Sequence, residues 1–191
     1  MKLGLVGNRD REVAAAIGRL EAAPAELGPD VPEAANLAKR VARGLHGRIP
    51  VIYAAQRQLE PVALRWRQQL NENANTLAHH GALPEQNHNE VVGWECPAGP
   101  LAATAVVALR DRGEHPRVRA RFEHVLPLAE AAGARVAAVE SRGERLLERL
   151  FSLVVTGDWV SLYLSFLNGV DPTPVTKIDG LKSRLEQIRA T

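Results

Sequence analysis

Four short apolar runs alternate with longer amphipathic segments along this chain, and this alternation limits the possible folds more than any other feature. The clearest run is Ala103–Leu109, in which alanine, valine and leucine predominate. An apolar run of this length without polar alternation is typical of a strand buried on both faces of a parallel sheet. The runs interpreted as strands are Ile49–Tyr53, Leu77–Leu83, Ala103–Leu109 and Ala134–Val139. The sequence therefore predicts a three-layer α/β/α fold with a mainly parallel, doubly wound sheet.

Apolar residues at helical spacing fill the segments between these runs. Pro32 suits the first turn of a helix, and Gly133 and Gly169 are suited to ending two others. Thr156-Gly157-Asp158 predicts a break in the longest helical segment, with Asp158 as the cap of a second helix. The expected helices are Arg9–Ala22, Glu33–Leu45, Gln58–Asn71, Pro116–Ala132, Gly143–Leu167 and Val175–Ile188.

The chain length of 191 residues suits one domain with a sizeable core. Proline, alanine and glycine are frequent in residues 1–31, which are interpreted as a helical N-terminal arm or linker remnant, and residues 32–191 as the domain itself. Connecting loops are expected at Pro24–Pro32 and Pro97–Pro100, because proline and glycine interrupt regular structure.

Charge and composition indicate a cytoplasmic protein that binds neither nucleic acid nor a membrane. The 24 basic and 22 acidic residues give a net charge of +2 and are interleaved, whereas a nucleic-acid-binding chain usually gathers its basic residues on one face. The single cysteine, Cys96, excludes an internal disulfide and fits a reducing compartment. The apolar run Leu3–Gly7 is too short for a signal peptide, and no run approaches the ~20 apolar residues of a membrane span.

Two polar clusters beside apolar segments contain the candidate catalytic residues. Asn71-Glu72-Asn73 ends an expected helix, and Glu85–Glu95 places His88 between two asparagines. A carboxylate can act as a base at a carbon next to a carbonyl, and an imidazole exchanges protons near neutral pH. Alternatively, Glu72 is a solvated residue at a helix end and His88 a loop histidine bonded to the backbone.

The compact turn at Ala54–Gln56 is a weaker candidate, because such turns can present backbone N–H groups to a phosphate in any α/β protein. His79 and His80, with His88, lack an acidic or cysteine partner at ligand spacing. Adjacent histidines also usually point apart, so no metal site is expected.

Five segments in order carry a resemblance to a known family: Arg65–Ala74, Leu83–Trp94, Gly157–Leu164, Asn168–Val175 and Ile178–Lys182. Together they resemble the C-terminal half of the bacterial and archaeal bifunctional phosphoglucose/phosphomannose isomerases, which belong to the sugar isomerase (SIS) domain superfamily. The similarity covers most of the chain from about Ala34 onward.

The resemblance implies an aldose–ketose isomerase that interconverts fructose 6-phosphate with glucose 6-phosphate and mannose 6-phosphate, without a metal or another cofactor. It implies that Glu72 moves a proton between C1 and C2 through a cis-enediol. It also implies that His88 helps to open the sugar ring, reaching the site from the other subunit of a homodimer. Lys182 is the expected assisting lysine, with Lys177 as the alternative, and Thr173 the small hydroxyl that makes room for the mannose epimer.

Asn87 and Gln56 complete the expected substrate-binding residues, Asn87 from the matching motif and Gln56 from the compact turn. Lys182 also has a plainer interpretation as a surface lysine on a charged helix.

One departure from the family is clear: the relatives have two SIS domains, and the first holds a Ser/Thr-rich loop that grips the sugar phosphate. Nothing in this chain has the pattern Ser-x-Ser-Gly-x-Thr. We therefore expect either one domain of a longer enzyme or a reduced protein. The alternative function is a non-catalytic sugar-phosphate-binding or dimerisation module.

Overall fold

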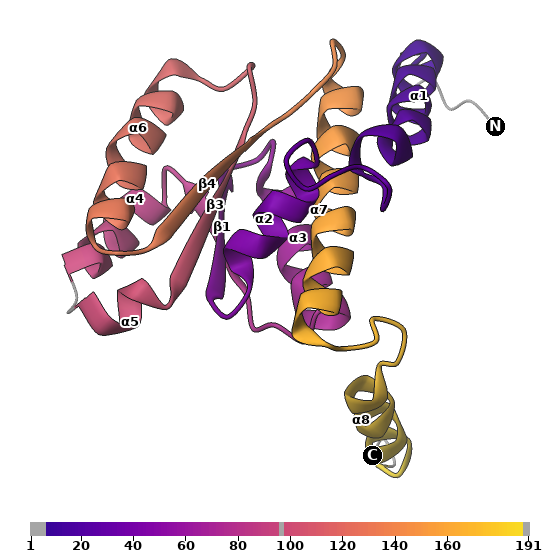
Figure 1. Ribbon diagram of the computed structural model, residues 1–191. Coiled ribbons are helices and arrows are strands. Elements are labelled where there is room, and N and C mark those ends of the chain that lie inside the picture. Colours follow the sequence, from indigo (N-terminus) through magenta and orange to yellow (C-terminus); the bar gives the residue numbers. More distant parts are fainter. Residues whose placement is uncertain (1–6, 96–97, 189–191) are drawn as a thin grey trace.

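The computed structural model describes residues 7–95 and 98–188, and the four expected strands form a single sheet. The strands are β1 (Ile49–Ala55), β2 (His79–Leu83), β3 (Thr104–Arg110) and β4 (Arg135–Glu140). Their order is β2-β1-β3-β4, and each neighbouring pair is parallel. Val107 of β3 pairs with Ile52 of β1 on one side and with Ala137 of β4 on the other. The prediction of a parallel sheet is confirmed (Figure 1).

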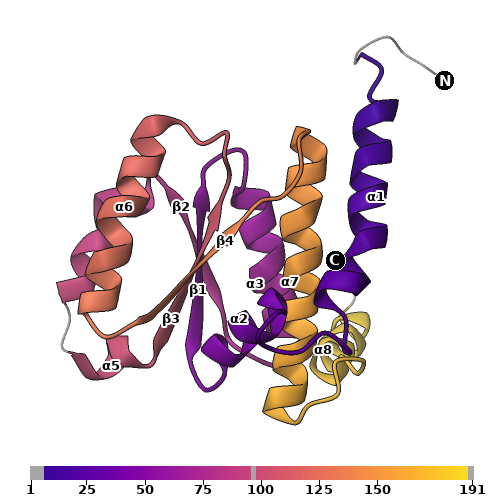
Figure 2. The same cartoon turned by 45° about the horizontal axis from the view of Figure 1, so that its top comes forward.

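Helices cover both faces of this sheet, which gives the predicted three layers (Figures 1 and 2). On one face, α2 and α3 lie with the long helix α7, and α1 packs on the outer side of α7. On the other face lie α6 and the short helices α4, η1 and α5. The helices are α1 (Asp10–Leu27), α2 (Leu37–Leu45), α3 (Glu60–Asn73), α4 (Gln86–Asn89), the 3₁₀ helix η1 (Glu90–Glu95), α5 (Ala98–Ala102), α6 (Pro116–Ala131), α7 (Leu146–Asn168) and α8 (Thr176–Glu186).

Each face of the sheet has its own hydrophobic core. Val107 packs with Trp66 of α3 in one core, whereas its neighbour Val106 packs with Phe122 of α6 in the other. Successive residues of a strand point to opposite faces, so a continuous apolar run such as β3 supplies both cores.

The helix α7 is the centre of the first core and contacts α1, α2 and α3. Contrary to the expectation from sequence, it is long and apolar enough to cross a membrane by length and composition. Half of its most apolar window is nevertheless buried inside the protein, and a core helix passes the same test. Packing against three helices accounts for its apolar character.

The first two helices differ from the expected boundaries. The helix α1 continues through Pro24 to Leu27, because Ala23 and Leu27 are buried and the Tyr163 hydroxyl of α7 donates a hydrogen bond to the Leu27 carbonyl. The helix α2 begins only at Leu37, where the Asn36 side chain accepts a hydrogen bond from the Lys39 N–H and acts as its N-cap. Tertiary contacts and capping therefore outweigh the proline and glycine signals here.

The connection after η1 also differs from expectation. A short helix, α5, forms over Ala98–Ala102, where the sequence predicted a loop at Pro97–Pro100. Cys96 and Pro97 lie outside the described residues.

The predicted break in α7 is wrong, because the helix is continuous through Gly157. A Cβ at this position would overlap Nε1 of Trp66, whose indole N–H donates a 2.8 Å hydrogen bond to the Leu153 carbonyl. Glycine is therefore required for the close approach of α3 and α7. Asp158 caps no helix and instead pairs with Arg65 of α3 at 3.0 Å.

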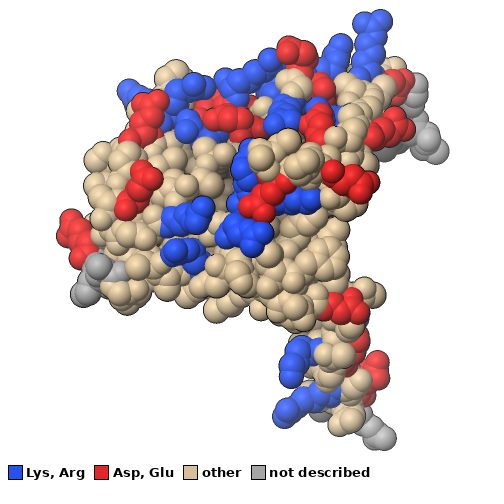
Figure 3. All heavy atoms as spheres, viewed as in Figure 1, with Lys and Arg blue, Asp and Glu red and all other residues tan. Residues whose placement is uncertain are grey.

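The surface carries both signs of charge. On the face shown in Figure 3, basic and acidic side chains are intermixed along the upper edge, further charged side chains, most of them basic, lie in the middle of the face, and an area without charged residues lies below them. The interleaving seen in the sequence is thus retained on this face.

We predict that Gly157→Ala destabilises the protein by about 1–3 kcal/mol, because the added methyl overlaps the Trp66 ring in a packed core. Gly18→Ala is the matched control, since a Cβ there meets nothing within 4 Å and the exposed middle of α1 favours alanine by roughly 0.5–1 kcal/mol. Urea unfolding of both variants measures the difference. If Gly157→Ala and Gly18→Ala have equal free energies of unfolding, the α3–α7 contact does not need glycine.

Candidate active site

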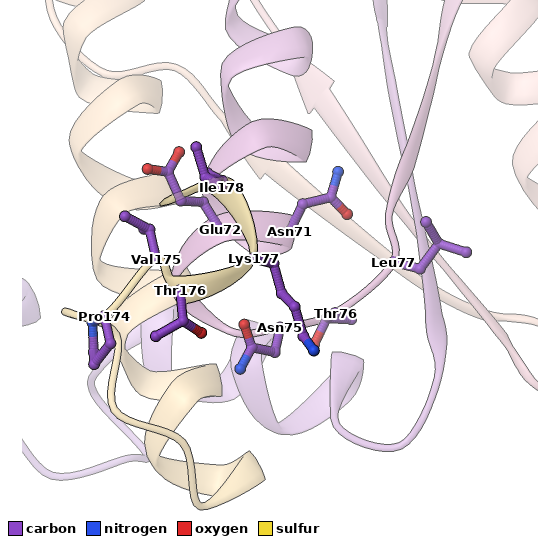
Figure 4. Close-up of a pocket in the computed structure, with 10 residues that line it drawn as sticks. All are labelled: Asn71, Glu72, Asn75, Thr76, Leu77, Pro174, Val175, Thr176, Lys177 and Ile178. Atoms are coloured by element: carbon purple, nitrogen blue, oxygen red, sulfur yellow. The ribbon is translucent and has the colours of Figure 1, made fainter. Parts of the chain in front are cut away.

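A cavity of about 610 Å³ lies where the end of α3 meets the beginning of α8 (Figure 4). The helix α3 runs back from the carboxyl end of β1 to the start of β2, so this cavity lies beyond the amino edge of the sheet. Its volume is typical of a site for a small molecule. The cavity is lined by Asn71, Glu72, Asn75, Thr76, Leu77, Pro174, Val175, Thr176, Lys177 and Ile178.

The side chains of two asparagines hold the loop between α3 and β2, one from the end of α3 and the other from the end of α7. Asn71 accepts a 2.8 Å bond from the Ala78 N–H. The Asn168 side chain donates to the Ala74 carbonyl at 2.8 Å and to the Thr76 hydroxyl at 2.9 Å. Asn168 is also the last residue of α7, so one amide joins the two segments whose continuations form the cavity.

Glu72 lies on the last turn of α3 with an exposed side chain, which agrees equally with a residue that acts on a ligand and with the plainer interpretation of a solvated residue at a helix end. In Figure 4 the Lys177 side chain extends toward Asn75 and Thr76, whereas the Glu72 carboxylate points away from the Lys177 amine. Within one chain the Glu72 carboxylate and the Lys177 amine therefore do not converge on one point, although both residues line the cavity.

The structure places Lys177, the alternative lysine, on the cavity rather than Lys182. Lys182 lies farther along α8, is exposed, and has Asp179 as a distant ion-pair partner at 3.9 Å. Thr173 immediately precedes the lining segment; it is exposed, and its N–H donates to the Asp171 carboxylate at 2.9 Å.

His88 lies in α4, at the carboxyl end of β2 and therefore at the opposite edge of the sheet. The five residues of β2 alone span roughly 16 Å at ~3.3 Å per residue. The helix α4 also lies on the α6 side of the sheet, whereas α3 lies on the α7 side (Figure 2). Glu72 and His88 of one chain are thus not brought together.

Gln56 and Asn87 accompany His88 at the carboxyl edge. The Gln56 side chain is exposed after β1, and the backbone N–H of Gln56 donates to the Leu83 carbonyl of β2 at 2.8 Å. The Asn87 side chain lines a second, smaller cavity between α4, η1 and α6. The predicted site residues therefore form two groups, one at each edge of the sheet.

The segment that carries His88 is attached to the sheet by Tyr53. This buried tyrosine of β1 donates a hydrogen bond to the carboxylate of Glu90, two residues after His88. Burial, together with the charge of Glu90, raises the pKa of the Tyr53 hydroxyl, so it remains protonated and able to donate.

At the carboxyl ends of β3 and β4, a buried ion pair fills the position beside the His88 group. Asp111 is 1% exposed and bonds to Arg149 at 2.7 Å, with further hydrogen bonds from Ser141 and the Gly113 N–H. Burial alone would raise the pKa of Asp111, but these donors outweigh it and hold the pKa below its usual value. Because internal donors satisfy both of its oxygens, this carboxylate is structural rather than available to a ligand.

Among residues 7–95 and 98–188, no three histidine, cysteine or acidic side chains are grouped as a metal site requires. His79 and His80 are successive residues of β2 and therefore point to opposite faces. Burial and the nearby charge of Arg67 lower the pKa of His80.

The sequence reasoning missed Asn75, Thr76 and Thr176 as lining residues and ranked Lys177 second. No motif pointed to Thr76, because its place in the cavity depends on the hydrogen bond from Asn168, 92 residues away. The proximity of Lys177 to the end of α3 likewise depends on the turn after α7.

The strand order and helical layers define the class of this protein as an α/β domain with the SIS fold. A glucose-6-phosphate isomerase-like protein from Thermus thermophilus superposes with a TM-score of 0.73 and 25% identity, covering 86% of this chain and 55% of that chain. Residues 34–185 match the model for the bacterial phospho-glucose isomerase C-terminal SIS domain. The chain belongs to this family.

Two relatives are named bifunctional phosphoglucose/phosphomannose isomerase. The protein from Caldicellulosiruptor bescii is 38% identical over 189 residues, which cover 99% of this chain and 56% of the relative. The protein from Aquifex aeolicus is 34% identical over 169 residues, covering 88% of this chain and 52% of the relative. The predicted family resemblance is confirmed, and the chain spans about half the length of these relatives.

We predict that Asn168→Ala lowers the free energy of unfolding by about 1–3 kcal/mol, because it removes both donors to the α3–β2 loop and leaves the buried Ala74 carbonyl without this partner. Hydrogen exchange should accelerate at residues 74–78. Asn89→Ala, which removes only two exposed bonds, one to the Glu85 carboxylate and one from the Glu90 N–H, is the control and should change neither quantity. Unchanged exchange in Asn168→Ala would show that the loop is held by other contacts.

We also predict that Arg149→Met costs about 3 kcal/mol, because it leaves the buried Asp111 carboxylate without its cation. Arg112→Met, which breaks the exposed pair with Glu144, should have little effect. Because the pKa of Asp111 is lowered in the folded protein, its carboxylate stabilises the folded state above about pH 4, the ordinary range of aspartate. This stabilisation is lost as the pH falls through the pKa of Asp111 in the folded state. Urea titrations from about pH 7 to about pH 2.5, which bracket that range, should therefore show a weaker acid dependence in Arg149→Met than in the parent.

Proposed function

We propose that this chain is the proton-transferring domain of an aldose–ketose isomerase that acts on hexose 6-phosphates. The observation that carries the proposal is Glu72 on a sugar-sized cavity with Lys177, inside the Asn-Glu-Asn motif of the family. The names of the relatives support the same substrate class.

In the proposed reaction, Glu72 removes the proton from C2 of the open-chain aldose phosphate and returns it to C1, through a cis-enediol. The Lys177 amine lies in the same cavity, where a cation stabilises the negative charge that develops on the enediol oxygens. Lys182 retains this role as the alternative if α8 rotates toward the cavity on binding. His88 exchanges the proton between the ring oxygen and the C1 hydroxyl during ring opening.

The separation of Glu72 and His88 in one chain supports a composite site. A homodimer in which α4 of one copy faces the Glu72 cavity of the other would bring the two groups together. A first SIS domain, corresponding to the rest of the relatives' length, would supply the Ser/Thr-rich phosphate loop, whose pattern does not occur in residues 1–191. Gln56, Asn87 and Thr173 are proposed to contact substrate in such an assembly.

The exposed apolar residues of α8 also support contact with a further protein surface. It projects away from the sheet and its covering helices, and its apolar residues Ile178, Leu181 and Leu185 are 41%, 57% and 55% exposed (Figure 1). These residues are spaced by three and four positions, so they form one apolar stripe along the helix.

The test is a coupled assay of fructose 6-phosphate conversion to glucose 6-phosphate. Glu72→Gln should reduce kcat by at least about 100-fold, because the amide cannot accept the proton. His88→Gln should reduce kcat as well, and a mixture of the two variants should regain activity, since a mixed dimer contains one site with both native groups. Lys177→Met and Lys182→Met show which amine assists.

Two outcomes would contradict the proposal in favour of another function. Stabilisation by fructose 6-phosphate without turnover, unchanged by Glu72→Gln, would favour a non-catalytic sugar-phosphate-binding module. A tight dimer whose melting temperature no hexose phosphate changes would favour a dimerisation module. Activity of both single variants equal to the parent would remove Glu72 and His88 from the mechanism.

A further inference from the structure

A second cavity, of about 370 Å³, lies on the opposite face of the sheet from Glu72, between α6 and the α4–η1 segment. Its basic side chains are Arg117, Arg121 and His124, which follow one another at intervals of four and three residues along α6. This spacing places them on one side of the helix. The remaining lining residues are Asn87, Val91 and Ala120.

The two guanidinium groups have no acidic partner in the part of the chain that the structure describes. Neither Arg117 nor Arg121 has a side-chain hydrogen bond or ion pair there, whereas arginines such as Arg110 and Arg149 are paired. Like charges four residues apart on a helix repel each other. Both side chains are exposed, so water and salt screen most of this repulsion, and a bound anion would relieve what remains.

Two acidic residues of the neighbouring segment, Glu85 and Glu90, are engaged elsewhere. The Glu90 carboxylate accepts the hydrogen bond from Tyr53, and the Glu85 carboxylate accepts one from Asn89 at 2.7 Å. Neither of these two carboxylates therefore pairs with the guanidinium groups of Arg117 and Arg121.

Asn87 is the independent observation that points to a ligand. Both polar atoms of its side chain have less than 1 Å² of exposed surface, and neither has a hydrogen-bond partner among the described residues. Buried amides in folded proteins are rarely left without partners, because the lost hydrogen bonds to water are costly. Here an unpaired amide N–H₂ lines the same cavity as the two unpaired guanidinium groups.

We propose that this cavity is a binding site for a phosphate-class oxyanion. Arginine presents N–H groups in a planar fork that matches two oxygens of a phosphate, and the Asn87 amide would donate to a third. The volume accommodates inorganic phosphate or the phosphate group of a small ester. Within one chain the site is separate from the Glu72 cavity. It shares Asn87 with the substrate contacts proposed above, and a phosphate group is the ligand assigned to that residue.

The test measures phosphate binding by calorimetry and by the melting temperature, with sodium chloride at matched ionic strength as the reference. We expect saturable binding to the parent chain, and a loss of about tenfold in affinity for Arg121→Gln, because one charge-assisted contact is removed. Arg119→Gln is the matched control: it removes an exposed arginine from the same helix, outside the cavity. Its affinity should remain within about twofold of the parent.

The side-chain amide resonances of Asn87 locate the ligand, since they should shift on addition of phosphate in the parent and not in Arg117→Gln/Arg121→Gln. Inorganic phosphate and fructose 6-phosphate are titrated separately. If the affinities for inorganic phosphate and for fructose 6-phosphate depend equally on Arg121, the site accepts the phosphate group of an ester. If only inorganic phosphate binds, the ligand is the free ion.

The proposal is overturned if phosphate stabilises the parent no more than chloride does, or if Arg119→Gln and Arg121→Gln lose affinity equally. The same holds if the basic residues bind only an acidic surface of a second copy, seen as dimerisation that they control without phosphate binding. Glu72→Gln distinguishes this site from the proposed catalytic one. Phosphate affinity should be unchanged in that variant, and its loss would assign the binding to the Glu72 cavity.

Discussion

The contact between Gly157 and Trp66 determines the geometry on which the candidate catalytic cavity depends. It allows α3 and α7 to approach closely, and the Trp66 indole then completes the contact by donating to the Leu153 carbonyl. Because both helices extend to the amino edge of the sheet, their ends meet there, and the Asn168 amide joins them. The position of Glu72 relative to Lys177 is therefore a consequence of how these two helices pack along their length.

Much of the fold follows from local sequence, because the parallel sheet leaves a clear pattern. Val106 and Val107 must be buried on opposite faces, so the run around them carried no polar alternation, and its assignment as a buried strand was correct. The glycine at position 169, with φ of 68°, ends α7 as its position after Asn168 indicated. Signals of this kind depend only on a few adjacent residues.

Features set by tertiary contact were not predictable in the same way. Gly157 looked like a helix break because the sequence does not reveal that Trp66 occupies the place of its side chain. Pro24 looked like the end of α1 because the burial of Leu27 against α7 is not visible locally. The motifs predicted Glu72 and His88 as a pair, but their placement at opposite edges of one sheet depends on the direction of α3 relative to β2.

That placement also explains why this domain has two distinct polar regions. In parallel α/β sheets, ligands usually bind beyond the carboxyl ends of the strands, where the strand order reverses. Here the strand order reverses between β1 and β3. Gln58 and Arg149 both bond to Asp111 at this point. The internal ion pair therefore occupies the position where a ligand usually binds. The polar groups of the carboxyl edge are consequently displaced toward β2, to Gln56, Asn87 and His88. The proposed base, Glu72, lies at the far end of α3, and the proposed ring-opening imidazole, His88, lies on this displaced segment. In the proposed reaction they act on one substrate across a contact between two molecules, which makes the quaternary arrangement part of the proposed chemistry.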